Sequence, residues 1–328
     1  MNILVTGSNG QVGTELRDLV KNLTPSEDND NYIFTAKEGN GDDILTLDIT
    51  DELAVKSFVK DNFINVIVNC AAYTKVDAAE IEYEIAKAIN EDAPRYLAEA
   101  ANQNGAVLIH LSTDYVFNGQ TFLPYVESHA KLPLNVYGRT KANGEYNVIN
   151  SGCNYIIIRT QWLYSNNGKN FFKTMFEKLW KKKHNPEGED ILNIVNDQLG
   201  TPTSAREVAI AIFHIINHNK DKQTLSKTGI YHFRNEGTAS WYDFAWEISE
   251  LIDKYVRQDP PAHLFLNPVS TSDYNRETEK KGKTIARRPL YAVLNTDKFK
   301  NTFDFTPLHW RQELEVVFGR EIAETNKK

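Results

Sequence analysis

Residues 1–13 read MNILVTGSNGQVG and contain the most informative pattern in the sequence. Residues 3–6 form a short apolar run, and Gly7, Gly10 and Gly13 follow it in the pattern Gly-x-x-Gly-x-x-Gly. Glycines at a strand-to-helix turn let a pyrophosphate approach backbone N–H groups closely, and the N-terminus of the next helix then faces the anion. Because the pattern lies between an apolar strand and a helical segment, it predicts a dinucleotide-binding turn.

Strands and helices alternate from this turn through the first half of the chain. Apolar runs that predict strands lie at residues 3–6, 32–35, 66–69, 107–112 and 155–159. Helical patterns lie at residues 11–22, 51–62, 81–104 and 140–150. The apolar runs are continuous rather than alternating, which is typical of strands covered on both faces. This order predicts an α/β fold with a doubly wound parallel sheet of the Rossmann type.

The second half is less regular and predicts a smaller C-terminal substrate-binding domain. We expect residues 1–160, joined by about 205–235, to form the dinucleotide-binding domain. Residues 161–204 and 236–328 would form the substrate-binding domain. Within it, the charged stretch 276–288 is expected to be a loop.

The composition is that of an ordinary globular protein. Of 328 residues, 41% are apolar and 25% are charged, so the chain can bury a sizeable core. The formal net charge of −7 argues against a nucleic-acid partner held by the overall field. Cys70 and Cys153 are too few for a disulfide framework, and the sequence has no secretory-signal pattern and no apolar run near the ~20 residues of a membrane span. We therefore expect a cytoplasmic protein without a membrane partner.

The end of the second expected strand bears on the choice of cofactor. An NAD site usually carries an acid there, about 20 residues beyond the glycines, to bind the ribose. This chain has Ala36 at that position, followed by Lys37 and Glu38. Lys37 could bind the 2′-phosphate of NADP or be a solvated surface charge, and Glu38 leaves NAD open. We expect NADPH slightly more than NADH.

Two further segments could contact the cofactor. Asp48 could hydrogen-bond the adenine amino group, and Asp48 or Thr50 could cap the helix expected from residue 51. Residues 69–73, Asn-Cys-Ala-Ala-Tyr, follow the third strand at its carboxyl end. Their small side chains would let a ribose and a nicotinamide lie close to the backbone, and tight packing is the alternative explanation.

A tyrosine and a lysine with helical spacing predict the catalytic centre. Tyr137 and Lys141 are four residues apart, which places phenol and ammonium on one face of a helix. The ammonium would lower the pKa of the phenol from its usual ~10, so that Tyr137 could donate a proton to a developing alkoxide. Ser112 and Thr113 lie at the end of the fourth strand, where doubly wound folds place their chemistry, and either hydroxyl could bind a ketone oxygen.

The glycine turn, the Ser-Thr pair and the Tyr-x-x-x-Lys pair together resemble the extended short-chain dehydrogenase/reductase family. Longer motifs resemble one group within it, the dTDP-4-dehydrorhamnose reductases. These motifs are LSTDYVFNG at 111–119, PLNVYG at 133–138, RTQWLY at 159–164, NDQLGTPT at 196–203, WYDFA at 241–245 and RRP at 287–289. The resemblance implies NAD(P)H-dependent reduction of the C4 ketone of dTDP-4-dehydro-L-rhamnose to dTDP-L-rhamnose, in rhamnose precursor biosynthesis. The implied partner is thus a small nucleotide sugar.

The resemblance also implies roles for the matched positions. Tyr137 would donate the proton, Lys141 would hold the nicotinamide ribose, and Thr113 would bind the substrate carbonyl. Asp114 and Trp162 would contact the sugar. A guanidinium fork suits phosphate, so Arg288 could bind the substrate diphosphate, or it could belong to a solvated basic loop. The full expected cofactor set is Gly7, Gly10, Gln11, Val12, Gly13, Lys37, Asp48, Ile49, Ala71, Ala72, Tyr73, Tyr137 and Lys141.

Two departures from the family pattern matter. The missing acid at the second strand removes the expectation of a strict NADH preference. Some members hold Mg²⁺ at a dimer contact through acidic residues on the first helix and beyond the Gly-x-Pro-Thr motif. Here Glu15 is present, but Arg206 occupies the second region. We expect a Glu15–Arg206 pair and no metal ligands, with Mg²⁺ and a homodimer left open.

Two other functions stay open on the sequence. A 4,6-dehydratase or 4-epimerase of the extended family would share the fold, but the dehydratases usually carry Thr-Asp-Glu, and Tyr115 follows Thr113 and Asp114 here. The second is a catalytically idle regulatory subunit, like the β subunit of methionine adenosyltransferase. The intact set of Thr113, Tyr137 and Lys141 argues against it.

Overall fold

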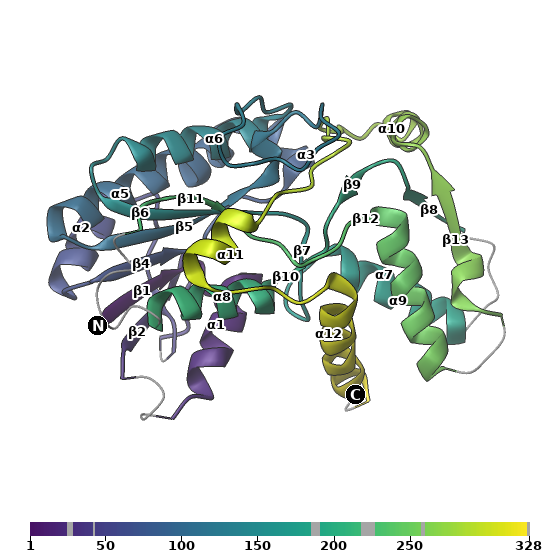
Figure 1. Ribbon diagram of the computed structural model, residues 1–328, viewed down its shortest axis with the longest axis horizontal. Helices are drawn as coiled ribbons and strands as arrows, with labels where there is room; N and C mark the ends of the chain where they lie inside the picture. The colour runs from purple at the N-terminus through teal and green to yellow at the C-terminus, as the bar shows by residue number, and fades with distance from the viewer. Residues whose placement is uncertain (25–28, 42, 185–190, 218–226, 257–259, 327–328) are drawn as a thin grey trace.

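The computed structural model describes residues 1–24, 29–41, 43–184, 191–217, 227–256 and 260–326. Its centre is a seven-stranded sheet in the order β11-β6-β5-β4-β1-β2-β3, and all neighbouring strands are parallel (Figure 1). The strands are β1 (Asn2–Thr6), β2 (Asn31–Ala36), β3 (Leu45–Thr46), β4 (Val66–Asn69), β5 (Val107–Thr113), β6 (Asn154–Thr160) and β11 (Gly229–His232). The predicted doubly wound α/β fold is confirmed.

Helices cover both faces of this sheet. On one face lie α1 (Gln11–Lys21) and α8 (Ala205–Asn217), and on the other lie α2 (Glu52–Asp61), α5 (Ala93–Asn104) and α6 (Val136–Ile149). Side chains along β1 point alternately to the two faces of the sheet. Ile3 and Val5 pack in the core with α1 and α8, and Leu4 packs in the core with α2 and α5. Because the strands are parallel, their carboxyl ends lie at one edge of the sheet, and the loops that leave β1, β4, β5 and β6 meet at that edge.

A second group of elements lies beside the sheet (Figure 1). It has its own core, rich in aromatic side chains. Phe172, Phe244 and Trp310 are fully buried in this core. The group comprises α7 (Phe171–His184), α9 (Trp241–Tyr255), α10 (Thr271–Lys280), α12 (Trp310–Thr325) and the strand pairs β8 (Leu192–Val195) with β13 (Leu266–Val269), β7 (Leu163–Tyr164) with β10 (Thr203–Ser204), and β9 (Leu199–Gly200) with β12 (Ala239–Ser240). Across the described residues, no helix is long and apolar enough to cross a membrane.

Two sequence predictions of local structure are wrong. The helix expected at 81–104 is divided into α4 (Tyr83–Lys87), a π-helical segment at Ala88–Asp92, and α5. Pro94 explains the interruption, because proline lacks an N–H donor and its ring clashes with the carbonyl four residues earlier. The stretch 276–288 is not a loop throughout, since α10 continues to Lys280 after Ser270 accepts a hydrogen bond from the backbone of Asp273.

The remaining short helices are α3 (Val76–Ala79) and α11 (Asp297–Phe303), with 3₁₀ turns at Asp114–Val116 and Ala262–Phe265.

Candidate active site

The glycine turn after β1 is shaped by close backbone contacts. Gly7 has a φ of +69°, and a Cβ there would lie 2.5 Å from the backbone nitrogen of Ala71. A Cβ at Gly13 would lie 2.5 Å from the carbonyl oxygen of Gly7. Helix α1 begins at Gln11 after Gly10, and no side chain in the described part of the chain caps it. The N–H groups of its first turn are therefore available to an anion.

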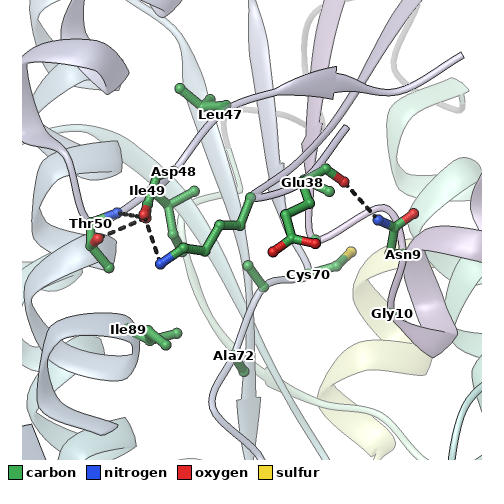
Figure 2. A pocket seen from close by; sticks show the side chains of 14 residues that line it. Asn9, Gly10, Glu38, Leu47, Asp48, Ile49, Thr50, Cys70, Ala72 and Ile89 are labelled. Carbon is green, nitrogen blue, oxygen red and sulfur yellow. Dashed lines mark hydrogen bonds and ion pairs between the residues drawn. The ribbon is translucent and has the colours of Figure 1, made fainter. Parts of the chain in front are cut away.

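A cavity of about 390 Å³ opens beside this turn. Figure 2 shows Asp48 and Thr50 on one side of it and Asn9 and Gly10 on the other. The lining residues are Gly7, Asn9, Gly10, Ala36, Lys37, Glu38, Leu47, Asp48, Ile49, Thr50, Cys70, Ala71, Ala72 and Ile89. The structure thus brings most of the expected cofactor residues to one place, at the edge of the sheet where doubly wound folds bind nucleotides.

Lys37 and Asp48 form an ion pair at this cavity, with Nζ and Oδ2 3.0 Å apart. Partial burial alone would raise the pKa of Asp48, but hydrogen bonds from the Thr50 hydroxyl and backbone N–H, together with Lys37, hold it below its usual value. Asp51 rather than Asp48 or Thr50 caps α2, because its side chain accepts from the backbone of Ala54. The capping explanation for Asp48 is therefore wrong.

Asn90 is hydrogen-bonded to the loop after β4, whose residues 70–72 line the cavity. No role was expected for Asn90 from the sequence. Its side chain accepts from the backbone N–H of Tyr73 at 2.9 Å and donates to the carbonyl of Tyr73 at 3.0 Å. Asn90 lies in the π-helical segment, and its own carbonyl packs where a Cβ at Gly144 would be, 2.1 Å away. Pro94 is the sequence signal that could have indicated Asn90, because a proline interrupts a helix and π-helical turns are frequent at functional sites.

The expected catalytic residues meet where β5 ends and α6 begins. Tyr137 and Lys141 lie one turn apart on α6, as the spacing predicts. Thr113 ends β5, its hydroxyl hydrogen-bonds the Tyr137 phenol, and it also donates to Oδ1 of Asp114 at 2.9 Å. The ring of Tyr115 packs edge-on against Tyr137, with ring centroids 5.5 Å apart.

The two hydroxyls at the end of β5 have different partners, and that of Ser112 is bonded away from Tyr137. Its Oγ donates to Glu145 at 2.6 Å, and Glu145 forms a bidentate pair with Arg159 at 2.8 and 2.7 Å. Glu145 and Arg159 are almost completely buried, and the pair ties α6 to β6. This leaves Thr113 as the hydroxyl that faces Tyr137.

The acid–base properties of the centre differ from the expected ones. Burial raises the pKa of Tyr137 to about 12, although its hydrogen bond with Thr113 acts in the opposite direction. Burial lowers the pKa of Lys141 to about 8, against the attraction of Glu145. The expected lowering of the Tyr137 pKa by Lys141 is therefore wrong for the protein without ligands. Lys141 instead donates to the carbonyl of Leu111 at 2.7 Å, on β5.

Several buried polar atoms at this edge have no hydrogen-bond partner among the described residues. They include Oδ2 of Asp114, Oγ1 of Thr160 and both polar atoms of the Gln161 side chain. Thr160 pairs with Thr113 across β5 and β6, so these groups lie around the ends of the two strands. Burial also raises the pKa of Asp114 to about 7. Buried polar groups are normally satisfied, so a polar ligand at this edge would supply the missing bonds. Sequence reasoning gave Gln161 no role.

The other expected substrate residues are held by neighbours. The Trp162 ring stacks on Trp241 with centroids 3.7 Å apart, and only a glycine fits at position 200, where a Cβ would lie 2.6 Å from the indole. Arg288 pairs with Asp77 at 2.8 Å. Burial acts to lower the pKa of Arg288, but the hydrogen bond and charge of Asp77 outweigh it and raise that pKa above its usual value. Arg288 is therefore a fixed side chain rather than part of a solvated loop.

A model of the RmlD substrate binding domain family matches residues 1–322. The chain belongs to the RmlD family. A dTDP-4-dehydrorhamnose reductase from Aggregatibacter actinomycetemcomitans is 37% identical over 316 residues, which are 96% of this chain and 97% of that protein.

Two further relatives of the RmlD-family chain are informative. A probable dTDP-4,6-dihydroxy-2-methyloxan-3-one 4-ketoreductase from Streptomyces antibioticus is 35% identical, covering 98% of this chain and 96% of that protein. The crystal structure of the dTDP-4-dehydrorhamnose reductase from Bacillus anthracis, in complex with NADP, is 32% identical with a TM-score of 0.79 and covers 97% of this chain and 99% of that one. The resemblance inferred from the sequence motifs is thus confirmed.

The expected Glu15–Arg206 pair is wrong for this RmlD-family chain. Glu15 pairs with Arg320 at 3.1 Å, and Arg206 donates to both carboxylate oxygens of Glu313 at 3.0 Å. Both partners lie on α12, whose position beside α1 and α8 the sequence did not predict. Within the described ranges, no group of three or more His, Cys, Asp or Glu side chains could hold a metal ion.

Proposed function

We propose that this protein uses NAD(P)H to reduce the C4 ketone of dTDP-4-dehydro-L-rhamnose to dTDP-L-rhamnose. The observation that carries this proposal is the meeting of Thr113, Tyr137 and Lys141 at the same sheet edge as the glycine turn and its cavity. A ketone reductase needs a proton donor next to a dinucleotide site. The names of the relatives support the sugar substrate and the rhamnose precursor pathway.

The cofactor is assigned to the glycine turn and the cavity. The close fit at Gly7 and the uncapped first turn of α1 suit a pyrophosphate, which would lie against Gly10, Gln11, Val12 and Gly13. Asp48 and Ile49 would hold the adenine, Lys37 the 2′-phosphate of NADPH, and Ala71, Ala72 and Tyr73 the ribose and nicotinamide. Once bound, the cofactor supplies a hydride to the ketone carbon.

The side chains of the catalytic centre handle the proton. Tyr137 keeps its proton at neutral pH because burial raises its pKa to about 12, so it is protonated when the hydride arrives, as a proton donor must be. It donates that proton to the C4 oxygen, and the hydroxyl of Thr113 hydrogen-bonds the same oxygen. Lys141, one turn further along α6, binds the nicotinamide ribose through its ammonium group.

Three residues are assigned to the substrate. The free Oδ2 of Asp114 would bond a sugar hydroxyl, the ring of Trp162 would lie against the sugar, and Arg288 would bind the diphosphate while remaining paired with Asp77. In this arrangement residues 1–160 with about 205–235 bind the cofactor. Residues 161–204 and 236–328 bind the nucleotide sugar together with Thr113 and Asp114 at the end of β5.

The test is oxidation of NADPH and of NADH in the presence of dTDP-4-dehydro-L-rhamnose generated in situ. Substrate-dependent oxidation that yields dTDP-rhamnose is the expected result. Oxidation only with a different dTDP-ketosugar would move the assignment toward the Streptomyces type of ketoreductase, which is 35% identical. Cofactor binding without oxidation of any ketosugar would contradict a reductase and favour a regulatory protein.

A further inference from the structure

His110 is a buried histidine that the proposed reaction does not use, and it lies directly behind Lys141. It is fully buried on β5, with its Nε2 3.4 Å from Nζ of Lys141. Its other ring nitrogen, Nδ1, lies 3.0 Å from Nδ2 of Asn69 at the end of β4. Which nitrogen carries the proton therefore depends on how the Asn69 amide is turned.

Two hydrogen-bond donors fix the orientation of the Asn69 side-chain amide. The backbone N–H of Ala71 donates to its Oδ1 at 3.1 Å, and the hydroxyl of Thr6 donates to the same oxygen at 2.7 Å. A backbone N–H can only donate, so it requires the oxygen of the amide on its side. The amino group of Asn69 is then left to donate to Nδ1 of His110.

The tautomer of His110 follows from this chain of hydrogen bonds. Burial, and then the charge of Lys141, lower the pKa of His110 well below its usual value, so the ring is neutral and carries one proton. Because Nδ1 accepts from Asn69, that proton is on Nε2, and the N–H points at Lys141. An ammonium has three donors and no acceptor, whereas a neutral amine has a lone pair that can accept. The Nε2–H group therefore suits a neutral Lys141.

We propose that His110, with its tautomer set by Asn69 and the backbone of Ala71, is a positioning residue that holds its Nε2–H toward Lys141 and favours the neutral amine of Lys141 over the ammonium. The inference deepens the proposed function, and only its effect on turnover rests on that function. The loop of Ala71 also lines the cofactor cavity, so the same backbone N–H links the cofactor site to the catalytic lysine.

The charged groups around Lys141 do not prevent His110 from favouring the neutral amine. The groups near the Lys141 side chain are His110 of β5, Glu145 of α6 and, beyond Glu145, Arg159 of β6 and Lys131. Tyr137 lies one turn earlier on α6. Glu145 favours the charged lysine, but it is already paired with Arg159 and Lys131. Burial acts in the same direction as the histidine, and the pKa of Lys141 is lowered to about 8.

The first test measures the tautomer directly in the full-length protein without substrate. Long-range ¹H–¹⁵N correlation spectra of ¹⁵N-histidine-labelled protein identify His110 by the signal that His110→Phe removes. We expect the Nε2–H form, unchanged between pH 6 and 8. An Nδ1–H form or a doubly protonated ring would overturn the inference.

Two variants test the origin of the tautomer. In Asn69→Asp, one carboxylate oxygen still accepts from Ala71 and the other accepts from His110, so the proton moves to Nδ1. Thr6→Val is the matched control, because it removes one hydrogen bond to Asn69 but leaves the backbone N–H that orients the amide. It keeps the Nε2–H form. A reversed tautomer in Thr6→Val, or an unchanged one in Asn69→Asp, would overturn the role of Ala71.

The second test follows the alkaline limb of kcat/KM against pH. His110→Phe removes the N–H without adding charge, and it should move the limb upward by about one pH unit. Asn69→Asp should move it in the same direction, and Thr6→Val should leave it in place. A shift in Asn69→Asp without one in His110→Phe would assign the effect to the added charge and overturn the proposal. The tautomer measurement needs no turnover, so an inactive protein would refute the proposed function alone.

Discussion

Removing the ammonium of Lys37 should weaken the preference for NADPH over NADH. Lys37 reaches Asp48 at the cofactor cavity, and its side chain is 76% exposed. In water, two unit charges 4 Å apart attract by about 1 kcal/mol, and a phosphate monoester carries roughly 1.5 to 2 charges. The competing contact with Asp48 offsets part of this gain. We therefore expect a loss of about 1–2 kcal/mol of NADPH selectivity, or roughly 5- to 30-fold.

The assay compares kcat/KM for NADPH with kcat/KM for NADH at fixed ketosugar and ionic strength. Lys37→Met should lower the ratio of the two through NADPH alone, with NADH kinetics nearly unchanged. Lys21→Met is the matched control, because it removes one exposed ammonium that pairs with Asp43 outside the cavity. A Lys37→Met ratio within twofold of the wild type would refute the reasoning and leave Lys37 as a surface charge.

The remaining predictions concern the catalytic centre and the buried charges. Tyr137→Phe should lower kcat by about 10²- to 10⁴-fold while NADPH fluorescence titration still shows binding, and a kcat within tenfold would remove Tyr137 as the proton donor. Glu145→Gln should cost about 3–5 kcal/mol in urea unfolding because Arg159 stays buried and loses its charge partner, and a loss under about 1 kcal/mol would contradict this. Burial and then Arg159 lower the pKa of His232 to about 3, whereas an unfolded histidine titrates near ~6.5. Between these values the unfolded state binds the extra proton, so the free energy of unfolding decreases as the pH is lowered. His232→Gln should reduce that slope by about 1.4 kcal/mol per pH unit near pH 5 and by less near pH 7, where an unfolded histidine is mostly neutral. Denaturation at pH 7, 6 and 5 measures the slope, and an unchanged slope would show that His232 is not buried neutral.

Five strands of the sheet can be predicted because their sequences are continuous runs of apolar, largely β-branched residues. The strand predicted at residues 66–69 has the same bounds as β4 (Val66–Asn69). The other four predicted strands differ from the observed ones by one residue at one or both ends. Gly7 could also be predicted, because the left-handed backbone there and the approach of Ala71 tolerate no side chain. Local chemistry dictates such features, so they can be found in a single sequence.

The parts that depend on distant neighbours were not predictable. The pairing of Glu15 with Arg320 requires α12, 305 residues away, to lie against α1. The pKa shifts of Tyr137 and Lys141 have the direction set by burial, and the depth of burial is a property of the whole fold. Likewise, His110 is an ordinary strand residue in the sequence, and only the register of β4 with β5 places it beside Asn69.

Isotope labelling follows the hydride from the cofactor to C4 of the sugar. The protein is given NADPH carrying deuterium at the transferable position, with dTDP-4-dehydro-L-rhamnose generated in situ, and the product is examined by NMR. We predict dTDP-L-rhamnose with one deuterium at C4 and stoichiometric loss of NADPH absorbance. A product without deuterium at C4, or no product while the cofactor remains bound, would contradict the account.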